Sequence, residues 1–309
     1  MKFAFFFPGQ GSQSVGMMSG YSDLAVIQDT FVEASDTLGV DFWKMATEPN
    51  DAINQTNNTQ PLMLAAGVAT WRAWIQQGGA QPSVLAGHSL GEYTALVASS
   101  ALAYRDALPL VQYRAEVMQH AVSEGVGGMA AILGLDDDVV RSICKEAAQA
   151  QVLEAVNFNS PGQVVIAGHK EAVERGMLAA KAIGAKRVVL LPVSVPSHCA
   201  LMRSAAKELQ AYLESVTVNV SQIPVLHNAD VLAYNESNKI KQALVGQLYS
   251  PVRWVETIQA IHDQGITKSA ECGPGKVLAG LTKRIVADFS CVALTNQDAL
   301  MAAQLELVN

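Results

Sequence analysis

The stretch SVLAGHSLGEYTALVAS, at residues 83–99, constrains the fold more than any other part of the chain. Its first four residues predict a short buried strand, and residues 90–99 predict a helix. Between them, Gly87-His88-Ser89-Leu90-Gly91 forms a GxSxG sequence. In a strand–turn–helix context this pattern indicates a sharp turn that exposes the serine hydroxyl.

The amino-acid composition excludes several classes of function for this protein. Of 309 residues, half are hydrophobic and 16% are charged, so the chain can bury a large core. The net charge of −7 and the lack of a Lys/Arg-rich run argue against a nucleic-acid partner. The four cysteines are scattered without metal-ligand spacing, and no apolar run has the length of a membrane span or signal peptide. We expect a soluble, reduced, cytoplasmic monomer without a metal or a membrane partner.

Strands and helices alternate in the first part of the chain, which favours an α/β fold with a parallel sheet. A helix is predicted from Thr59-Gln60-Pro61 to about residue 77, with Pro61 near its first turn. The alternation returns at 223–228, 252–264 and 268–271. We therefore expect a large α/β-hydrolase-like domain formed by residues 1–122 and 195–309.

The segment 123–194 has a different pattern. Strands are predicted at 129–135, 152–158, 163–167 and 186–193, with helices from the Asp136-Asp137-Asp138 cap to about 150 and at 170–183. This βαββαβ order is typical of ferredoxin-like domains. We expect a small inserted domain over 123–194.

The N-terminal stretch FFFPGQGSQ predicts a strand, Phe3 to Phe7, and a glycine-rich loop. The loop fits neither nucleotide-binding pattern: counted from Gly9, the sixth position is Ser14, and no Gly-Lys-Ser/Thr follows. It is interpreted as a strand-to-helix turn.

Ser89 is the candidate nucleophile, and the alternative is a serine that merely caps a helix. The Leu90 N–H is the natural first oxyanion donor. A base is required, and His198, in a proline-held loop where the insert ends, is the best candidate, with His227 second. No acid lies on an obvious strand-end loop between 89 and 198, which favours a dyad in which a carbonyl oxygen orients the imidazole.

The remaining histidines are not expected to act as the base. His88 is expected to point into the core beside the nucleophile, and surface positions are expected for His120, His169 and His262.

Arg114 lies on a predicted helix over 105–122, and its neighbours on that face are apolar: Leu110, Val111, Val117 and Met118. A buried guanidinium suits two-point contact with a carboxylate. The carboxylate could belong to a substrate or to an acid elsewhere in the fold.

These motifs together resemble the malonyl-CoA:acyl carrier protein transacylase family. PGQGSQ, TNNTQP, GHSLGEYTALV, YRAEVMQ, VPSHC and QLYSPVRW occur in the family's order, from residue 3 to about 280. The resemblance implies malonyl transfer from malonyl-CoA to acyl carrier protein through a malonyl-serine intermediate in fatty acid synthesis, with no cofactor.

The resemblance also implies residue roles. Ser89 would be the nucleophile, His198 its base, and the Gln247 carbonyl would orient His198. The backbone N–H groups of Gln10 and Leu90 would form the oxyanion hole. The substrate-binding residues implied are Arg114 for the malonyl carboxylate, with Met118 and Ser197 lining its pocket. Many polyketide malonyl domains carry phenylalanine where this chain has Ser197.

Three rival functions fit the sequence less well. An esterase or thioesterase would share the elbow but gives no reason for Arg114. A patatin-like lipase would need an Asp-Gly-Gly/Ala motif, which the sequence lacks. A carrier-binding scaffold would not need Ser89, His198 and Arg114 together. For an acidic partner, Lys186-Arg187 and Lys283-Arg284 are candidate contacts, although solvated surface charge is the more common explanation of such pairs.

Overall fold

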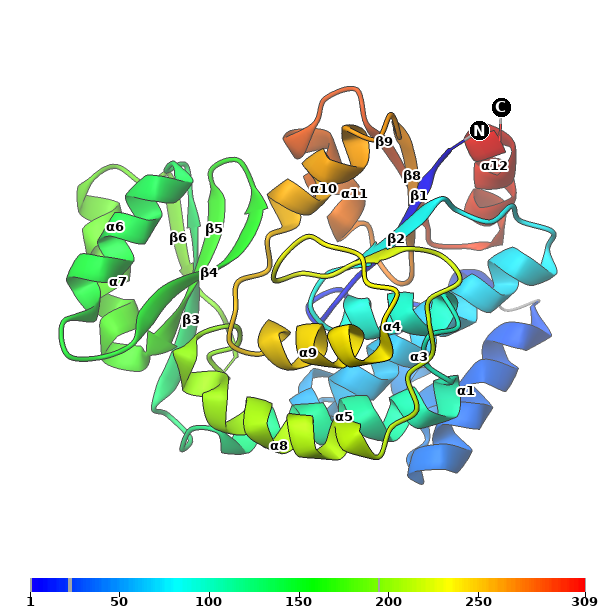
Figure 1. The fold of residues 1–309 in the computed structure, drawn as a ribbon, viewed down its shortest axis with the longest axis horizontal. Coiled ribbons are helices and arrows are strands. Elements are labelled where there is room, and N and C mark those ends of the chain that lie inside the picture. The colour runs from blue at the N-terminus through cyan, green and yellow to red at the C-terminus, as the bar shows by residue number, and fades with distance from the viewer. Residues whose placement is uncertain (1, 22–23, 194, 309) are drawn as a thin grey trace.

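A computed structural model describes residues 2–21, 24–193 and 195–308, and the chain folds around two separate β-sheets (Figure 1). The larger sheet has the strand order β7-β2-β1-β8-β9, and each neighbouring pair is parallel. Its strands are β1 Ala4–Phe7, β2 Val84–Gly87, β7 Val225–Leu226, β8 Lys268–Cys272 and β9 Ser290–Leu294. The predicted parallel sheet is confirmed.

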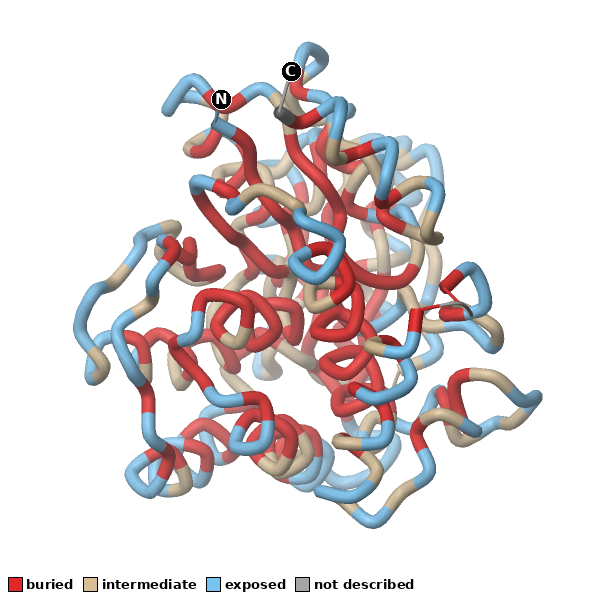
Figure 2. The backbone as a smooth tube through the Cα atoms, turned by 90° about the vertical axis from the view of Figure 1, so that its right-hand side faces the viewer, coloured by how far each residue is buried: buried red, intermediate tan, exposed pale blue. Residues whose placement is uncertain are grey.

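Helices cover both faces of the larger sheet, and the alternation of side chains along β1 shows why. Phe5 and Phe7 belong to the main core with residues of α1 (Ala25–Leu38), α3 (Thr56–Gln76) and α5 (Tyr104–His120). The intervening Phe6 belongs to a second core with α10 (Trp254–His262) and α11 (Val277–Ile285). Side chains alternate across a strand, so an apolar strand such as AFFF requires cover on both sides. The buried stretches accordingly gather in the centre of the molecule (Figure 2).

The smaller sheet is antiparallel, with the strand order β4-β5-β3-β6. Its elements are β3 Gly127–Leu133, α6 Asp137–Ala148, β4 Leu153–Ser160, β5 Gln163–His169, α7 Lys170–Ala182 and β6 Arg187–Leu190. The predicted βαββαβ order is therefore present. One face packs against α6 and α7, and the other contacts Cys199, the residue after the candidate base.

The remaining helices all lie outside residues 123–194, in the same part of the chain as the larger sheet. They are α2 Phe42–Thr47, α4 Gly91–Ala98, α8 Arg203–Glu214, α9 Ser237–Gln247 and α12 Gln297–Val308, with short 3₁₀ turns η1 Ser19–Tyr21, η2 Ala52–Asn54 and η3 Ala200–Met202. Across the described residues, no helix is both long enough and apolar enough to cross a membrane.

Three local predictions need correction. Helix α3 begins at Thr56, not at Thr59, because the Gln55 carbonyl already accepts from the N–H groups of the next turn, so Pro61 lies inside the helix. Strand β6 ends at Leu190, before Pro192, which has no N–H to extend the ladder. Asp136 precedes α6 as predicted but makes no side-chain capping bond.

We propose that the domain boundaries lie at 122/123 and 194/195. Every element of the antiparallel sheet falls within 123–194, and every strand of the parallel sheet falls outside it. The termini of the proposed catalytic domain, residues 1 and 309, and the end of the insert, residue 194, lie outside the described residues.

Candidate active site

The turn after β2 holds Ser89 in a left-handed backbone conformation, with φ of 52°. Such a conformation is strained for a residue with a side chain. The flanking glycines make the turn sterically feasible: a Cβ on Gly87 would come within 1.9 Å of the Gly91 carbonyl carbon, and one on Gly91 within 2.0 Å of the Phe7 oxygen. Strand, turn and helix can approach each other this closely only without those side chains.

The structure brings Ser89 and His198 into direct contact. Ser89 Oγ lies 2.8 Å from His198 Nε2, and His198 Nδ1 lies 2.8 Å from the Gln247 carbonyl oxygen. Since a carbonyl only accepts, Nδ1 carries the proton and Nε2 is free to accept from the serine. Burial, followed by the nearby Arg114 charge, lowers the pKa of His198 to about 3. The imidazole is therefore neutral near pH 7, as a general base must be.

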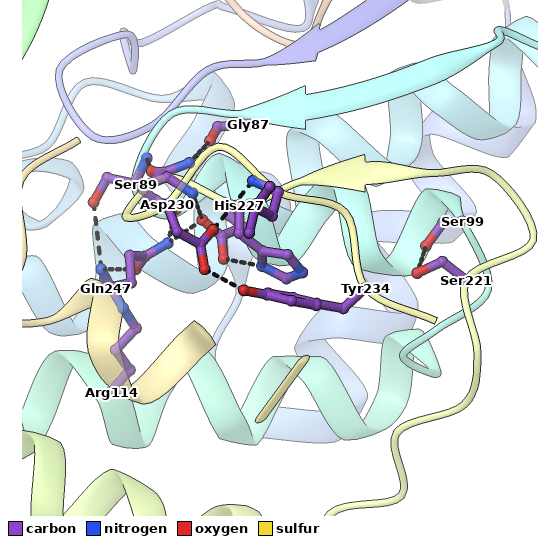
Figure 3. Close-up of polar contacts among 12 residues, drawn as sticks. Gly87, Ser89, Ser99, Arg114, Ser221, His227, Asp230, Tyr234 and Gln247 are labelled. Atoms are coloured by element: carbon purple, nitrogen blue, oxygen red, sulfur yellow. Dashed lines mark hydrogen bonds and ion pairs between the residues drawn. The ribbon is translucent and has the colours of Figure 1, made fainter. Parts of the chain in front are cut away.

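Arg114 is buried next to Ser89 and Gln247, and the groups that accept its hydrogen bonds are uncharged (Figure 3). Its Nη1 donates to Gln60 Oε1 at 2.7 Å, and Nη2 donates to Gln247 Oε1 at 2.9 Å and to Ser89 Oγ at 3.3 Å. Its Nε has no hydrogen-bond partner within the described part of the chain. A cation this deeply buried without a direct counter-ion is costly, so the site favours an anionic ligand.

The loop after β1 lies against the nucleophile turn. A Cβ added to Gly9 would sit 2.4 Å from the His88 carbonyl oxygen, which shows how closely the two turns pack. Gln10 and Leu90 both line the cavity, and among the described residues neither backbone N–H donates to another protein group. Two free donors beside a serine hydroxyl can stabilise a developing oxyanion.

The cavity between the two domains has a volume of about 140 Å³. Its lining includes every sequence-predicted site residue except Gln247, which lies behind Arg114 and His198. Met118 and Ser197 are among the lining residues, and the smaller sheet contributes Met129 and Asn157. The site is thus assembled from both domains.

His227, the second candidate for the base, lies in a different environment. Its Nδ1 is 2.7 Å from Glu92 Oε1, and both side chains are buried. Of the other histidines, His88 has its Nε2 2.8 Å from Asn159 Oδ1 in the smaller sheet, so it joins the domains instead of simply entering the core. His120 is exposed, whereas His169 and His262 are half-buried.

Sequence reasoning missed three buried polar residues around the serine: Gln60, Glu92 and Asn228. Asn228 Oδ1 accepts from the Ser89 N–H at 2.7 Å, and its Nδ2 donates to the Gly87 carbonyl at 2.7 Å. A signal for Glu92 was present in GHSLGE, where a glutamate lies in the first turn of an otherwise apolar helix. Asn228 follows strand β7 at the same sheet edge as Ser89, a position that also carries information.

No cluster of three or more His, Cys, Asp or Glu side chains suited to a metal ion occurs within residues 2–21, 24–193 and 195–308. The two predicted basic pairs lie partly together. Lys186 and Arg284 line one surface groove, and Arg284 Nη1 donates to Gln163 Oε1 at 3.1 Å.

Comparison with known proteins places this geometry in a family. Residues 4–302 match the family described as acyl transferase domain. The malonyl CoA-acyl carrier protein transacylase of Salmonella typhimurium is 52% identical over 304 residues, which cover 98% of each chain.

Solved structures agree with the sequence comparison. The acyl-carrier-protein S-malonyltransferase of Burkholderia pseudomallei is 56% identical, with a TM-score of 0.97 over 99% of this chain and 100% of that one. A malonyl-transacylase solved in complex with a type II PKS acyl-carrier protein is 50% identical, with a TM-score of 0.97 over 99% of this chain and 100% of that one. The chain therefore belongs to the acyl transferase family, among its malonyl-CoA:acyl carrier protein transacylases.

Proposed function

We propose that the protein transfers a malonyl group from malonyl-CoA to the phosphopantetheine thiol of acyl carrier protein and so supplies fatty acid synthesis. The observation that carries the proposal is the buried Arg114 guanidinium, whose Nη2 lies 3.3 Å from the oxygen of the candidate nucleophile. A malonyl ester on Ser89 would carry its free carboxylate two carbons from the ester carbonyl, within reach of this cation. Full-length relatives named malonyl transacylases support the same activity.

The first half-reaction begins at the Ser89–His198 contact. His198 Nε2 takes the Ser89 proton as Oγ attacks the malonyl thioester carbonyl, and the Gln247 carbonyl stabilises the imidazolium through Nδ1–H. The N–H groups of Gln10 and Leu90 stabilise the tetrahedral oxyanion. On its collapse the C–S bond breaks, and the CoA thiolate takes the proton from His198.

The second half-reaction reverses these steps with a new thiol. His198 accepts the proton of the phosphopantetheine thiol, and the thiolate attacks the malonyl-Ser89 ester. The C–Oγ bond breaks, and Ser89 recovers its proton from His198. One thioester replaces another, so the chemistry requires neither a metal nor a redox cofactor. Under this proposal the protein needs no cofactor, and it acts in the cytoplasm.

The roles of the remaining residues follow from their positions. Arg114 would bind the malonyl carboxylate, with Gln60 and Gln247 holding its guanidinium. Met118 and Ser197 would form the walls of the acyl pocket. The Met118 thioether lies 3.9 Å from Gln60 Nε2, so it packs behind the same polar group that holds Arg114.

A transfer assay tests the proposal. The purified enzyme is given malonyl-CoA, acetyl-CoA or methylmalonyl-CoA, and CoA release is measured with and without acyl carrier protein. We expect malonyl transfer that depends on the carrier, and Arg114→Ala should lower it by about 100-fold or more, because hydrogen bonds to a charged partner are lost.

Acetyl transfer has no carboxylate to lose, so Arg114→Ala should change it much less. CoA release that is equally fast without the carrier would indicate a thioesterase. Equal losses for malonyl and acetyl groups would remove Arg114 from substrate recognition.

A further inference from the structure

Glu92 is a buried carboxylate three residues after the nucleophile, and groups from two distant segments donate to it. Its Oε1 lies 2.7 Å from His227 Nδ1, and its Oε2 accepts from the Asn228 N–H and from Gln247 Nε2, both at 2.9 Å. A carboxylate is the side chain that can accept from donors on both of its oxygens. Glu92 thus links the helix after the nucleophile to the segment after β7 and to the end of α9.

The Gln247 amide links Glu92 to the acyl pocket. Figure 3 shows Gln247 beside Ser89 and Arg114. Gln247 Nε2 donates to Glu92 and to the Ser89 carbonyl at 3.0 Å, while its Oε1 accepts from Arg114. Arginine only donates, so a flipped amide would set its NH₂ group against the guanidinium. Because Glu92 accepts from the NH₂ end, the carbonyl end must face Arg114.

This arrangement also keeps the charge of Arg114 available. The amide lies between Glu92 and Arg114, so the two residues form no direct ion pair, and the guanidinium meets neutral oxygens. A carboxylate in place of the Gln247 amide would neutralise the cation and compete with an acidic substrate. The neutral amide fixes the orientation of the guanidinium without neutralising its charge.

The second branch from Glu92 reaches the nucleophile itself. Asn228, whose N–H Glu92 holds, bonds to the backbone on both sides of the strained turn, at Gly87 O and Ser89 N. This branch affects the serine whatever acyl group it carries, whereas the Gln247 branch affects a group that carries a carboxylate. The two branches can therefore be separated by the choice of substrate.

We infer that Glu92 is a positioning residue for acyl-group selection: through the Gln247 amide it fixes the Arg114 guanidinium that receives the malonyl carboxylate. The inference rests on the proposed function. Its signature is the ratio of kcat/KM for malonyl-CoA to that for acetyl-CoA, since a purely structural role for Glu92 would lower both values together.

The test compares four variants with the wild-type enzyme. Glu92→Met keeps an unbranched side chain but has no carboxylate acceptor. We expect malonyl kcat/KM to fall about 100-fold, with a raised KM for malonyl-CoA, and acetyl kcat/KM to fall about 10-fold or less. Gln247→Met, which keeps the backbone carbonyl on His198, should lower the same ratio.

Two further variants provide the rescue and the control. In Glu92→Gln the neutral His227 imidazole can carry its proton on Nε2, so that Nδ1 accepts from the new NH₂ group. The remaining amide oxygen then accepts from Gln247 and Asn228, and the ratio should return to within about threefold of wild type. Glu271→Gln alters the other fully buried glutamate, at the end of β8. It should leave the ratio unchanged.

Several results would overturn the inference. They are an unchanged malonyl/acetyl ratio in a folded Glu92→Met, a ratio in Glu92→Gln as low as in Glu92→Met, or a lowered ratio in Glu271→Gln. If thermal melting shows that Glu92→Met does not fold, an unchanged ratio in Gln247→Met overturns it instead. A wild-type enzyme that transfers no malonyl group refutes the proposed function, a result distinct from all of these.

Discussion

Two strand-to-helix turns at the same edge of the larger sheet have similar construction. The first leads from β2 to α4 and the second from β8 to α11. Each is glycine-rich, and each carries a fully buried glutamate, Glu92 in the first and Glu271 in the second. The local sequences GHSLGE and ECGPGK would therefore suggest comparable sites.

Their surroundings differ in what other elements contribute. Glu92 accepts from donors in the segment after β7 and at the end of α9. Its turn faces a cavity that α5, the 195–198 loop and the smaller sheet also line. Glu271 Oε2 accepts from the Ala279 N–H of α11, the helix that follows it directly, and its Oε1 has no partner among the described residues. Burial raises the pKa of Glu271 to about 7. A strand-to-helix turn becomes a site only when distant side chains converge on it.

The largest effect should come from the nucleophile of the first turn. Ser89→Ala removes the one atom of the protein that bonds to the acyl group in the proposed mechanism, so malonyl transfer should fall by roughly 10⁴-fold or more. Intact-protein mass spectrometry after incubation with malonyl-CoA should show no malonyl adduct. The matched control is Cys272→Ala in the second turn, which removes a buried thiol and should keep a full adduct.

The opposite result for either variant would contradict this comparison of the two turns. A full adduct on Ser89→Ala would place the nucleophile elsewhere. An adduct lost in Cys272→Ala would bring the second turn into the chemistry.

The next largest effect should come from the loop that packs on the first turn. In Gly9→Ala the new methyl group would meet the His88 carbonyl oxygen at 2.4 Å, so the Gln10 N–H must move away from Ser89. Loss of one oxyanion donor lowers kcat by about 10²- to 10³-fold. Because both half-reactions use that donor, pre-steady-state acylation and carrier transfer should slow together.

Gly246→Ala is the control, since a Cβ there meets nothing within 4 Å although the residue precedes Gln247. Its activity should stay within about twofold of wild type. Normal kcat in Gly9→Ala would remove the loop from the oxyanion hole.

The sequence predicts what depends on local pattern. The Ser89 elbow follows from a strand, a helix and close-packed glycines in one stretch, and the βαββαβ insert follows from the order of its elements. The pairing of Ser89 with His198 follows from the position of His198 in a proline-held loop. The role of the Gln247 carbonyl in orienting His198 is implied by the family resemblance.

The hydrogen-bond network behind the serine could not be predicted in this way. Glu92 bonds to groups 136 and 155 residues away along the chain, so its partners are set by tertiary packing. A third catalytic acid is expected on a strand-end loop, whereas Glu92 lies on a helix and bonds to His227, Asn228 and Gln247. His227 could be a base by sequence but is paired with this acid instead.

The pH dependence of stability should show the effect of burying Glu271 beside the second turn. The folded-state pKa of Glu271 is raised to about 7 from 4.5, so the folded protein binds the extra proton and loses stability as pH rises through that range. Glu271→Gln has no proton to lose. Relative to wild type it should gain roughly 3 kcal/mol in free energy of unfolding between pH 4 and pH 8.

Urea unfolding of both proteins at the two pH values measures this gain. Glu256→Gln provides a control of opposite sign, because a hydrogen bond from Arg253 lowers the pKa of Glu256 and its contribution is lost as pH falls. A difference between wild type and Glu271→Gln that is the same at both pH values would show that burial does not shift the Glu271 carboxyl.

The smallest effect on activity should come from two surface cations. One of them lies on α11, the helix that follows the second turn. Arg284 on α11 and Lys186 line a groove of about 430 Å³ beside the β4–β5 turn, and Asn159 of the same hairpin contacts His88. If an acidic carrier protein docks there, Arg284→Glu and Lys186→Glu should each raise its KM by about 2- to 10-fold at low salt, since rim charges act weakly. The effect should fade as salt screens it, and malonyl-Ser89 formation should be unchanged. Lys44→Glu, which changes an exposed side chain of α2, is the control for net charge. An equal rise in KM for Lys44→Glu would assign the effect to overall charge and leave the second turn without a part in the reaction.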